Sequence, residues 1–189
     1  MIPARGILPA LLVYLLLISG SAAAICNGTN ENTAVLFSTP TTDFVTHADG
    51  TVTHVPTGLV WKRCSEGQEW NGSTCTGSDT SFDWQGALIH ANEHSFAGHA
   101  DWRLPNVKEL KSIVERRCWN PAINTVIFPG ATSGWFWSAS PDARDIFIPG
   151  ILGAWQVRFN DGGLWVMSRK EPGFGFGGYG SVRLVRTDQ

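Results

Sequence analysis

Apolar residues recur with two different spacings along this chain, and the two spacings predict short strands on either side of two helices. Before the helices, alternation of apolar and polar residues predicts strands over 44–47, 51–54 and 59–63. After the helices, it predicts strands over 135–138, 154–159, 163–167 and 181–186. Asp49-Gly50 and Asn160-Asp161-Gly162-Gly163 are typical of hairpin turns. This order of elements favours an α+β domain with an irregular antiparallel sheet.

The first helix is expected to run from Trp84 to about His94. Asp83 is a suitable N-cap, and Gly98 lies beyond the C-terminal end. One apolar stripe follows the helical spacing and should face the core: Trp84, Ala87, Leu88 and Ala91.

The second helix is expected to begin at Val107. Pro105 keeps the preceding backbone extended, Asn106 is a suitable N-cap, and Glu109 completes a capping box. The positions expected to be buried are Val107, Leu110, Ile113 and Val114, and those expected to face water are Lys108, Lys111, Ser112 and Glu115. Just upstream, Asp101 and Arg103 are expected to pair across Trp102.

The segment 1–24 has the pattern of a signal peptide. Arg5 provides the positive charge, 10–18 is an apolar run too short to cross a bilayer comfortably, and Ala22-Ala23-Ala24 offers a cleavage site. Lipid attachment at Cys26 is an alternative, although the preceding isoleucine stands where a small residue is expected.

After the leader, the chain is expected to divide into an N-terminal arm, 25–49, and one domain, 50–188, which is large enough for one core. We expect no membrane span once the leader is removed. The mature protein should be exported, either to the periplasm or to the cell surface and beyond.

Four cysteines, an even number, favour disulfides in an exported chain. The absence of a C-x-x-C pair argues against zinc. Turn-forming residues between Cys64 and Cys75 allow the ends of that segment to meet. Of the three connectivities, we therefore expect Cys64–Cys75 and Cys26–Cys118.

The charge of the chain argues against a general electrostatic attraction to nucleic acid or anionic lipid, so any polyanion would have to meet a local cluster of cations. The net charge is −2, or −3 without Arg5, and no run of like charges is present. Nucleic acid and anionic membranes favour a concentrated basic surface, so neither is an expected partner. Enzyme motifs are also missing, because there is no G-x-S-x-G elbow, no phosphate loop and no recognisable glycosidase carboxylate pair. We expect a non-catalytic protein with no cofactor and no bound metal.

One motif, in contrast, is typical of a zinc enzyme. Residues 90–94 spell H-x-x-E-H on the first expected helix, a pattern used by one class of zinc peptidase because residues i and i+4 share a helix face. A zinc hydrolase that uses His90, Glu93 and His94 is therefore a remote alternative. No third ligand is obvious in the sequence, and two polar residues beside a buried stripe also explain the pattern.

Nine tryptophans are unusual for a chain of this length and predict two groups of aromatic residues. The group expected in the core is Trp61, Trp84, Trp102, Trp137 and Trp155. The group expected at strand ends or in glycine-rich loops, where rings can stack on a sugar, is Trp135, Trp165, Phe174, Phe176 and Tyr179. With nearby polar side chains, the candidate ligand-binding residues are Trp135, Arg144, Asp145, Arg158, Asn160, Asp161, Trp165, Arg169, Lys170 and Tyr179.

Six separate motifs occur in a fixed order: TGLVW (57–61), FDWQGAL (82–88), AGHADWRLP (97–105), NPAIN (120–124), FWSAS (136–140) and VRLVR (182–186). Together they resemble the C-terminal domain of the bacterial collagen-like adhesin Lcl and its relatives, over roughly residues 50 to 187. More distantly, Arg103-Leu104-Pro105 before a helix and the late strand 181–186 are similar to formylglycine-generating-enzyme and C-type-lectin-like folds.

The resemblance implies a small C-type-lectin-like domain with two helices and an irregular antiparallel sheet, stabilised by disulfides. The residues that form its structural motif are Asp101, Trp102, Arg103, Pro105, Asn106 and Glu109. Formylglycine-generating enzymes use cysteines late in the domain, and none follows Cys118, which excludes that chemistry here. Phe159-Asn160-Asp161 and Glu171-Pro172-Gly173 resemble calcium-binding elements of lectins, but their order is reversed and carboxylates are few, so a turn is expected at the first.

We therefore expect an exported bacterial module that recognises a glycan or another extracellular polymer, because the resemblance implies adhesion. Relatives are associated with sulfated glycosaminoglycans. The basic cluster expected for such a ligand is Arg144, Arg158, Arg169 and Lys170. The alternative is an envelope structural or protein-interaction domain without a small ligand.

Overall fold

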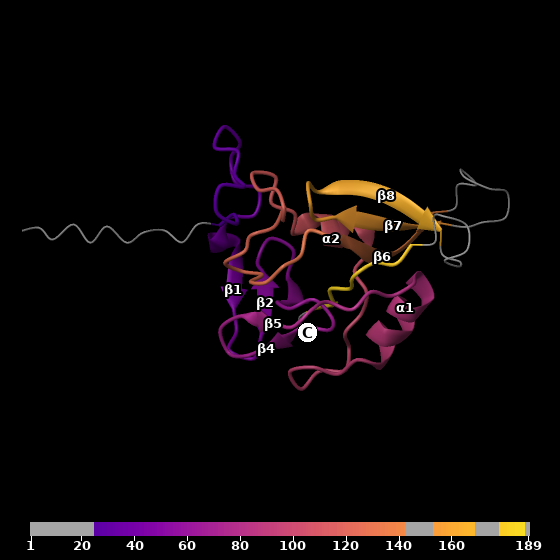
Figure 1. The fold of residues 1–189 in the computed structure, drawn as a ribbon. Coiled ribbons are helices and arrows are strands. Elements are labelled where there is room, and N and C mark those ends of the chain that lie inside the picture. Colours follow the sequence, from indigo (N-terminus) through magenta and orange to yellow (C-terminus); the bar gives the residue numbers. More distant parts are fainter. Residues whose placement is uncertain (1–24, 143–152, 169–177, 188–189) are drawn as a thin grey trace, which may run out of the picture.

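The computed structural model describes residues 25–142, 153–168 and 178–187. These residues form an α+β domain with antiparallel sheets, two α-helices and two disulfides, which confirms the predicted class (Figure 1). No helix in the described part of the chain is both long and apolar enough to cross a membrane.

The first sheet contains four strands in the order β1-β2-β3-β9, namely β1 (Phe44–Thr46), β2 (Thr51–His54), β3 (Leu59–Lys62) and β9 (Val185–Thr187). The β1–β2 hairpin turns at the predicted Asp49-Gly50. Asp49 accepts hydrogen bonds from the backbone and the hydroxyl of Thr51, which fixes this turn. β9 then brings the end of the chain beside β3.

A second sheet, in the order β6-β7-β8, lies on the other side of the molecule. Its strands are β6 (Trp135–Asp142), β7 (Gly153–Arg158) and β8 (Gly163–Ser168). Gly162 has a φ of 75° in the tight turn between β7 and β8, and an added Cβ there would lie 2.5 Å from Val114 Cγ1. This turn therefore requires glycine both for its backbone conformation and for its close packing.

The two α-helices are α1 (Trp84–Glu93) and α2 (Val107–Ser112), and a two-stranded hairpin is formed by β4 (Glu69–Trp70) and β5 (Cys75–Thr76). Asp83 caps α1 by accepting from the Gly86 amide at 2.6 Å, and Ala87 and Ala91 are buried as predicted. A 3-10 turn at Thr41–Asp43 precedes β1.

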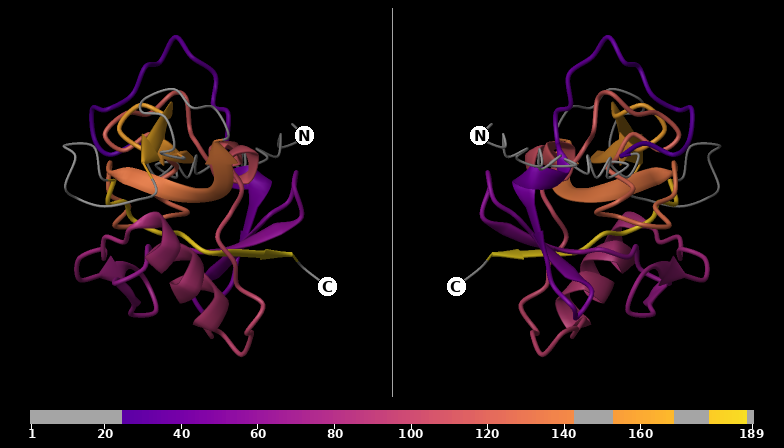
Figure 2. Two further views of the ribbon diagram at one scale, coloured as in Figure 1. Left: turned by 90° about the vertical axis from the view of Figure 1, so that its right-hand side faces the viewer. Right: turned by 90° about the vertical axis from the view of Figure 1, so that its left-hand side faces the viewer.

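Alternating residues of the central strands face two separate hydrophobic cores. On β3, Trp61 packs in one core with α2, whereas its neighbour Val60 packs in the other with α1. On β6, Phe136 and Trp137 divide in the same way. Figure 2 shows the C-terminal segment (yellow) crossing the molecule between α1 and the β6–β8 sheet. Successive strand residues point to opposite faces, so these strands are buried on both sides.

Both predicted disulfides are present, Cys64–Cys75 and Cys26–Cys118. The first closes the loop that carries the β4–β5 hairpin. The second joins the N-terminal arm to the segment after α2, across 92 residues of sequence. An ion pair between Glu31 and Arg117 at 2.5 Å supports the same junction.

Three sequence-based expectations were wrong. Asp101 and Arg103 do not pair with each other, since Arg186 donates to Asp101 at 2.9 Å and Arg103 binds Glu109 through two bonds of 2.7 Å. The last strand begins only at Val185, because 181–184 makes isolated contacts with several neighbouring segments in place of a continuous ladder.

The third correction concerns Glu115, which was expected to face water but is fully buried. α2 ends at Ser112, so the helical periodicity that predicted exposure does not extend to this residue. Its carboxylate accepts hydrogen bonds from Ser38, Thr39 and the Arg117 amide. A buried acceptor with this many donors is satisfied without a cation.

Candidate binding groove beside helix α2

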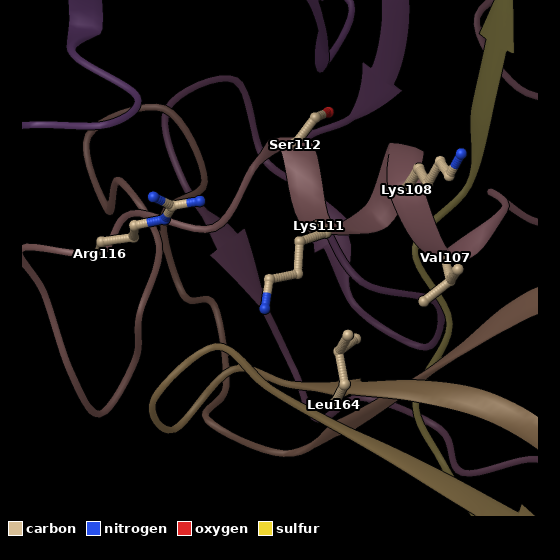
Figure 3. A pocket seen from close by; sticks show the side chains of 6 residues that line it. All are labelled: Val107, Lys108, Lys111, Ser112, Arg116 and Leu164. Carbon is tan, nitrogen blue, oxygen red and sulfur yellow. The ribbon is translucent and has the colours of Figure 1, made fainter.

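An open groove runs between α2 and β8, with a volume of about 330 Å³ (Figure 3). Its lining residues come from the helix, the segment after it and one strand: Val107, Lys108, Lys111, Ser112, Arg116 and Leu164. Figure 3 shows Lys111 extending between Arg116 and Leu164. The groove therefore combines cationic side chains with an apolar surface.

The position of α2 is fixed by its N-terminal capping box. Asn106 accepts from the amides of Lys108 and Glu109, both at 2.9 Å, and the Glu109 carboxylate accepts from the Asn106 amide at 2.8 Å. Arg103 holds the same carboxylate, and its hydrogen bonds keep the pKa of Glu109 below the usual value. The motif residues thus support the helix that carries two of the cations of the groove, Lys108 and Lys111.

The remaining motif residues also have structural positions. Trp102 is buried, and its indole donates to the Phe96 carbonyl at 3.0 Å. The Arg186 hydrogen bond keeps the pKa of Asp101 low. Pro105 is buried, and its carbonyl accepts from the Ala139 amide at 2.7 Å, which ties the start of α2 to β6.

The groove is locally basic although the chain is acidic overall. None of its six lining residues carries a carboxylate. Lys111 donates to the Gly162 carbonyl at 2.9 Å, while Lys108 and Arg116 are exposed. None of these three cations forms an ion pair with a residue in the described ranges, whereas Arg103, Arg117, Arg158 and Arg186 each have an acidic partner. A bound anion would therefore meet cations that no described carboxylate neutralises.

A separate aromatic surface lies at the end of the β6–β8 sheet. The rings of Trp135 and Trp165 are 6.5 Å apart between centroids, and the Arg158 guanidinium lies 5.1 Å from the Trp135 ring. Arg158 also pairs with Asp161, and their hydrogen bond raises the pKa of Arg158 and lowers that of Asp161. Trp165 is half exposed. Four predicted ligand-binding residues are thus brought together here.

Two of the other predicted ligand-binding residues, Asn160 and Tyr179, lie in the described part of the chain. Asn160 lies in the β7–β8 turn, where its carbonyl accepts from the Asn120 amide at 2.8 Å. Tyr179 is exposed, and its carbonyl accepts from the Gln156 side-chain amide (Nε2) at 3.5 Å. Arg144, Asp145, Arg169 and Lys170 lie outside the described residues, as do Phe174, Phe176 and Glu171-Pro172-Gly173.

The groove and the aromatic surface lie on opposite faces of β8. Leu164 pairs with Val157, which faces the core below α2, whereas Trp165 pairs with Gln156 on the other face. Because adjacent strand residues alternate, the two features are separate sites on one edge strand.

Sequence reasoning missed the groove because two of its cations, Lys108 and Lys111, were assigned only to the solvent face of a helix. Their spacing at 108 and 111 gave a signal, but the part contributed by β8 depends on a contact between distant segments. Sequence reasoning also missed Glu66, which lies against His90 and His94 and which no local pattern associates with them. Glu93, the acidic residue of the H-x-x-E-H pattern, is exposed and does not belong to this group.

Comparisons with known proteins give one result that covers most of the chain. The family described as the Lcl C-terminal domain matches residues 50–186, a stretch that contains the groove and both helices. No curated protein and no solved structure matches the chain. The protein belongs to the Lcl C-terminal domain family.

Proposed function

We propose that this protein is an exported binding module that holds an acidic extracellular glycan in the groove between α2 and β8. The observation that carries the proposal is the concentration of Lys108, Lys111 and Arg116 around an apolar surface, with no carboxylate among the lining residues. Sulfate and carboxylate groups of a glycan pair with such cations, and the apolar faces of sugar rings pack against aliphatic side chains.

The open shape of the groove supports a polymer ligand. A small ligand is usually held in an enclosed pocket, whereas a chain of sugars needs a site that is open at its ends. The aromatic surface around Trp135 and Trp165 lies on the opposite face of the same edge strand. A long polymer that passes the edge of β8 would reach both surfaces.

The proposal also includes a route of export and a fold type. Export through a signal peptide over 1–24 is supported by the two disulfides, which form in oxidising compartments. A C-type-lectin-like fold is supported by Arg103-Leu104-Pro105 before α2 and by the late strand β9. The periplasm and the cell surface both satisfy the disulfide argument.

Binding of a heparin oligosaccharide to the oxidised mature chain tests the proposal, with its desulfated counterpart and a neutral oligosaccharide as comparisons. We expect the affinity for heparin to fall with salt, and the double variant Lys108→Gln/Arg116→Gln to bind about tenfold more weakly, since each exposed charge contributes up to about 1 kcal/mol. Arg158→Gln tests the aromatic surface separately, because it removes a cation there and leaves the groove intact, and we expect it to weaken binding less than the double variant does.

Unchanged binding in the double variant together with lost binding in Arg158→Gln would place the ligand on the aromatic surface and contradict the groove assignment. Absence of binding to all three oligosaccharides would reject glycan recognition and favour an envelope protein-interaction domain.

A further inference from the structure

A group of polar side chains lies apart from the groove, between β3 and α1. Glu66 is 2 % exposed, and its Oε2 atom lies 2.7 Å from His90 Nε2 and 3.5 Å from His94 Nδ1. One donor atom from each of the three residues can be chosen so that all lie within 4.8 Å of one another. The three side chains therefore converge on one point.

Rigid elements position each member of the group. His90 and His94 are one turn apart on α1 and its C-terminal cap, a helix that Asp83 caps. The Glu66 amide donates to the Val182 carbonyl at 2.9 Å, and the Glu66 carbonyl accepts from the Thr80 amide at 2.8 Å. The backbone on both sides of the group is thus fixed before any ligand binds.

We propose that Glu66, His90 and His94 bind a divalent transition-metal ion of the zinc class. Two imidazoles and one carboxylate are ligands that zinc, cobalt and nickel prefer over calcium or magnesium. Bonds of about 2.0–2.1 Å in tetrahedral geometry place ligand atoms about 3.3 Å apart. The two separations from Glu66 Oε2, 2.7 and 3.5 Å, lie on either side of that value, and the three ligand atoms lie within 4.8 Å of one another, so side-chain adjustment without backbone rearrangement completes the geometry.

The histidine side of this group is open to the solvent. The side chain of His90 is 32 % exposed and that of His94 is 19 % exposed, whereas Glu66 is buried behind them. An ion therefore has an entry path along the imidazoles, and water supplies the last ligand. Three protein ligands and one open position form the usual arrangement of zinc sites that exchange a ligand.

Lys62 is the main competitor for the site. Its ammonium lies 2.6 Å from Glu66 Oε1 and 2.9 Å from His94 Nε2. In each of these two side chains, the atom that Lys62 contacts is not the one proposed to bind the metal. The contact with Oε1 is an ion pair whose direction does not satisfy hydrogen-bond geometry. Lys62 contacts Oε1, so Oε2 is left to the imidazoles, which approach it either as hydrogen-bond donors or, in this proposal, as fellow ligands of an ion. A metal at Oε2 requires the Lys62 ammonium to leave His94 Nε2, which carries the proton once Nδ1 binds the ion.

Two measurements on the tag-free mature chain test this site. Zinc binding is titrated by calorimetry, and the absorption spectrum of the cobalt form reports the coordination geometry. We expect one ion per chain with a Kd of about 10 µM or tighter, a tetrahedral cobalt spectrum, and no comparable calcium binding. His90→Gln and His94→Gln should each weaken zinc binding about tenfold or more. His99→Gln is the matched control, since this histidine is exposed and lies outside the group.

Lys62→Met should tighten zinc binding, because it removes a positive charge next to the ion. No zinc bound at about 1 mM, or equal affinity in the wild type and the His90→Gln/His94→Gln double variant, would overturn the proposal. If a folded Lys62→Met variant bound zinc no more tightly than the wild type, that result would also contradict an ion at Glu66 Oε2. Circular dichroism of each variant establishes that it is folded. Heparin binding by the same variants separates this result from the proposed glycan function.

Discussion

Replacing Glu115 by glutamine should lower the free energy of unfolding by about 2–4 kcal/mol, although the two side chains have nearly the same size. Glu115 Oε2 accepts from the Thr39 amide at 2.7 Å and from the Thr39 hydroxyl at 3.0 Å. Its Oε1 accepts from the Ser38 amide at 3.0 Å, the Ser38 hydroxyl at 3.2 Å and the Arg117 amide at 2.9 Å. These bonds connect the N-terminal arm to the segment that follows α2.

A glutamine keeps only one oxygen, so its NH₂ group must face one set of donors. The best orientation places it against Thr39, where the hydroxyl can rotate to accept but the backbone N–H cannot. One buried N–H then loses its partner, which costs about 1–3 kcal/mol, and the remaining bonds lose the strength that the negative charge gave them. Loss of the desolvation cost of that charge offsets part of this effect.

Urea denaturation of the oxidised protein, monitored by tryptophan fluorescence, measures the change, and thermal unfolding should show a midpoint about 4–16 °C lower. Glu93→Gln on the exposed face of α1 is the control, expected within about 0.5 kcal/mol of the wild type. A loss below about 1 kcal/mol for Glu115→Gln, with an unchanged control, would show that the arm is not held by this carboxylate.

Three further predictions concern stability. Replacing Cys26 and Cys118 by serine should cost about 2–5 kcal/mol in urea denaturation, because their bond closes a loop of 92 residues; equal stability of the variant and the wild type would contradict this. Gly162→Ala should cost about 1–3 kcal/mol in the same assay, since alanine is strained at a φ of 75° and its Cβ meets a valine of the core, and a neutral result would show that the turn can relax. The Arg103 hydrogen bonds depress the pKa of Glu109, so this carboxylate stabilises the fold above its ordinary pKa of 4.5 and the effect disappears as the pH falls through the folded value. The stability difference between the wild type and Glu109→Gln should accordingly be largest near pH 7 and shrink below about pH 4.5, and a difference independent of pH would refute the assignment.

Local patterns predicted most of the fold because short-range chemistry determines those elements. The Asn106 capping box, the Asp49-Gly50 hairpin and the stripe on α1 each depend on residues within a few positions. Glu115 and the pairing of Arg103 could not be predicted in this way. Their partners depend on where α2 ends and on which segments it meets.

The candidate site was less predictable than the fold. Aromatic composition identified Trp135 and Trp165, whose rings lie close together, but Lys108 and Lys111 of the groove were assigned to solvent. The contribution of Leu164 follows from the packing of α2 against the β6–β8 sheet, a contact between segments some 50 residues apart. A sequence pattern contains no direct information on such a contact.

The strands that are buried on both faces determine how the domain unfolds. β3 and the segment 182–185 supply side chains to both hydrophobic cores, so neither core retains its packing if these strands leave. Partial opening of the described domain into two independent lobes would expose apolar surface on both halves at once. Unfolding should therefore be a single cooperative event, with the slowest amide exchange in these shared strands.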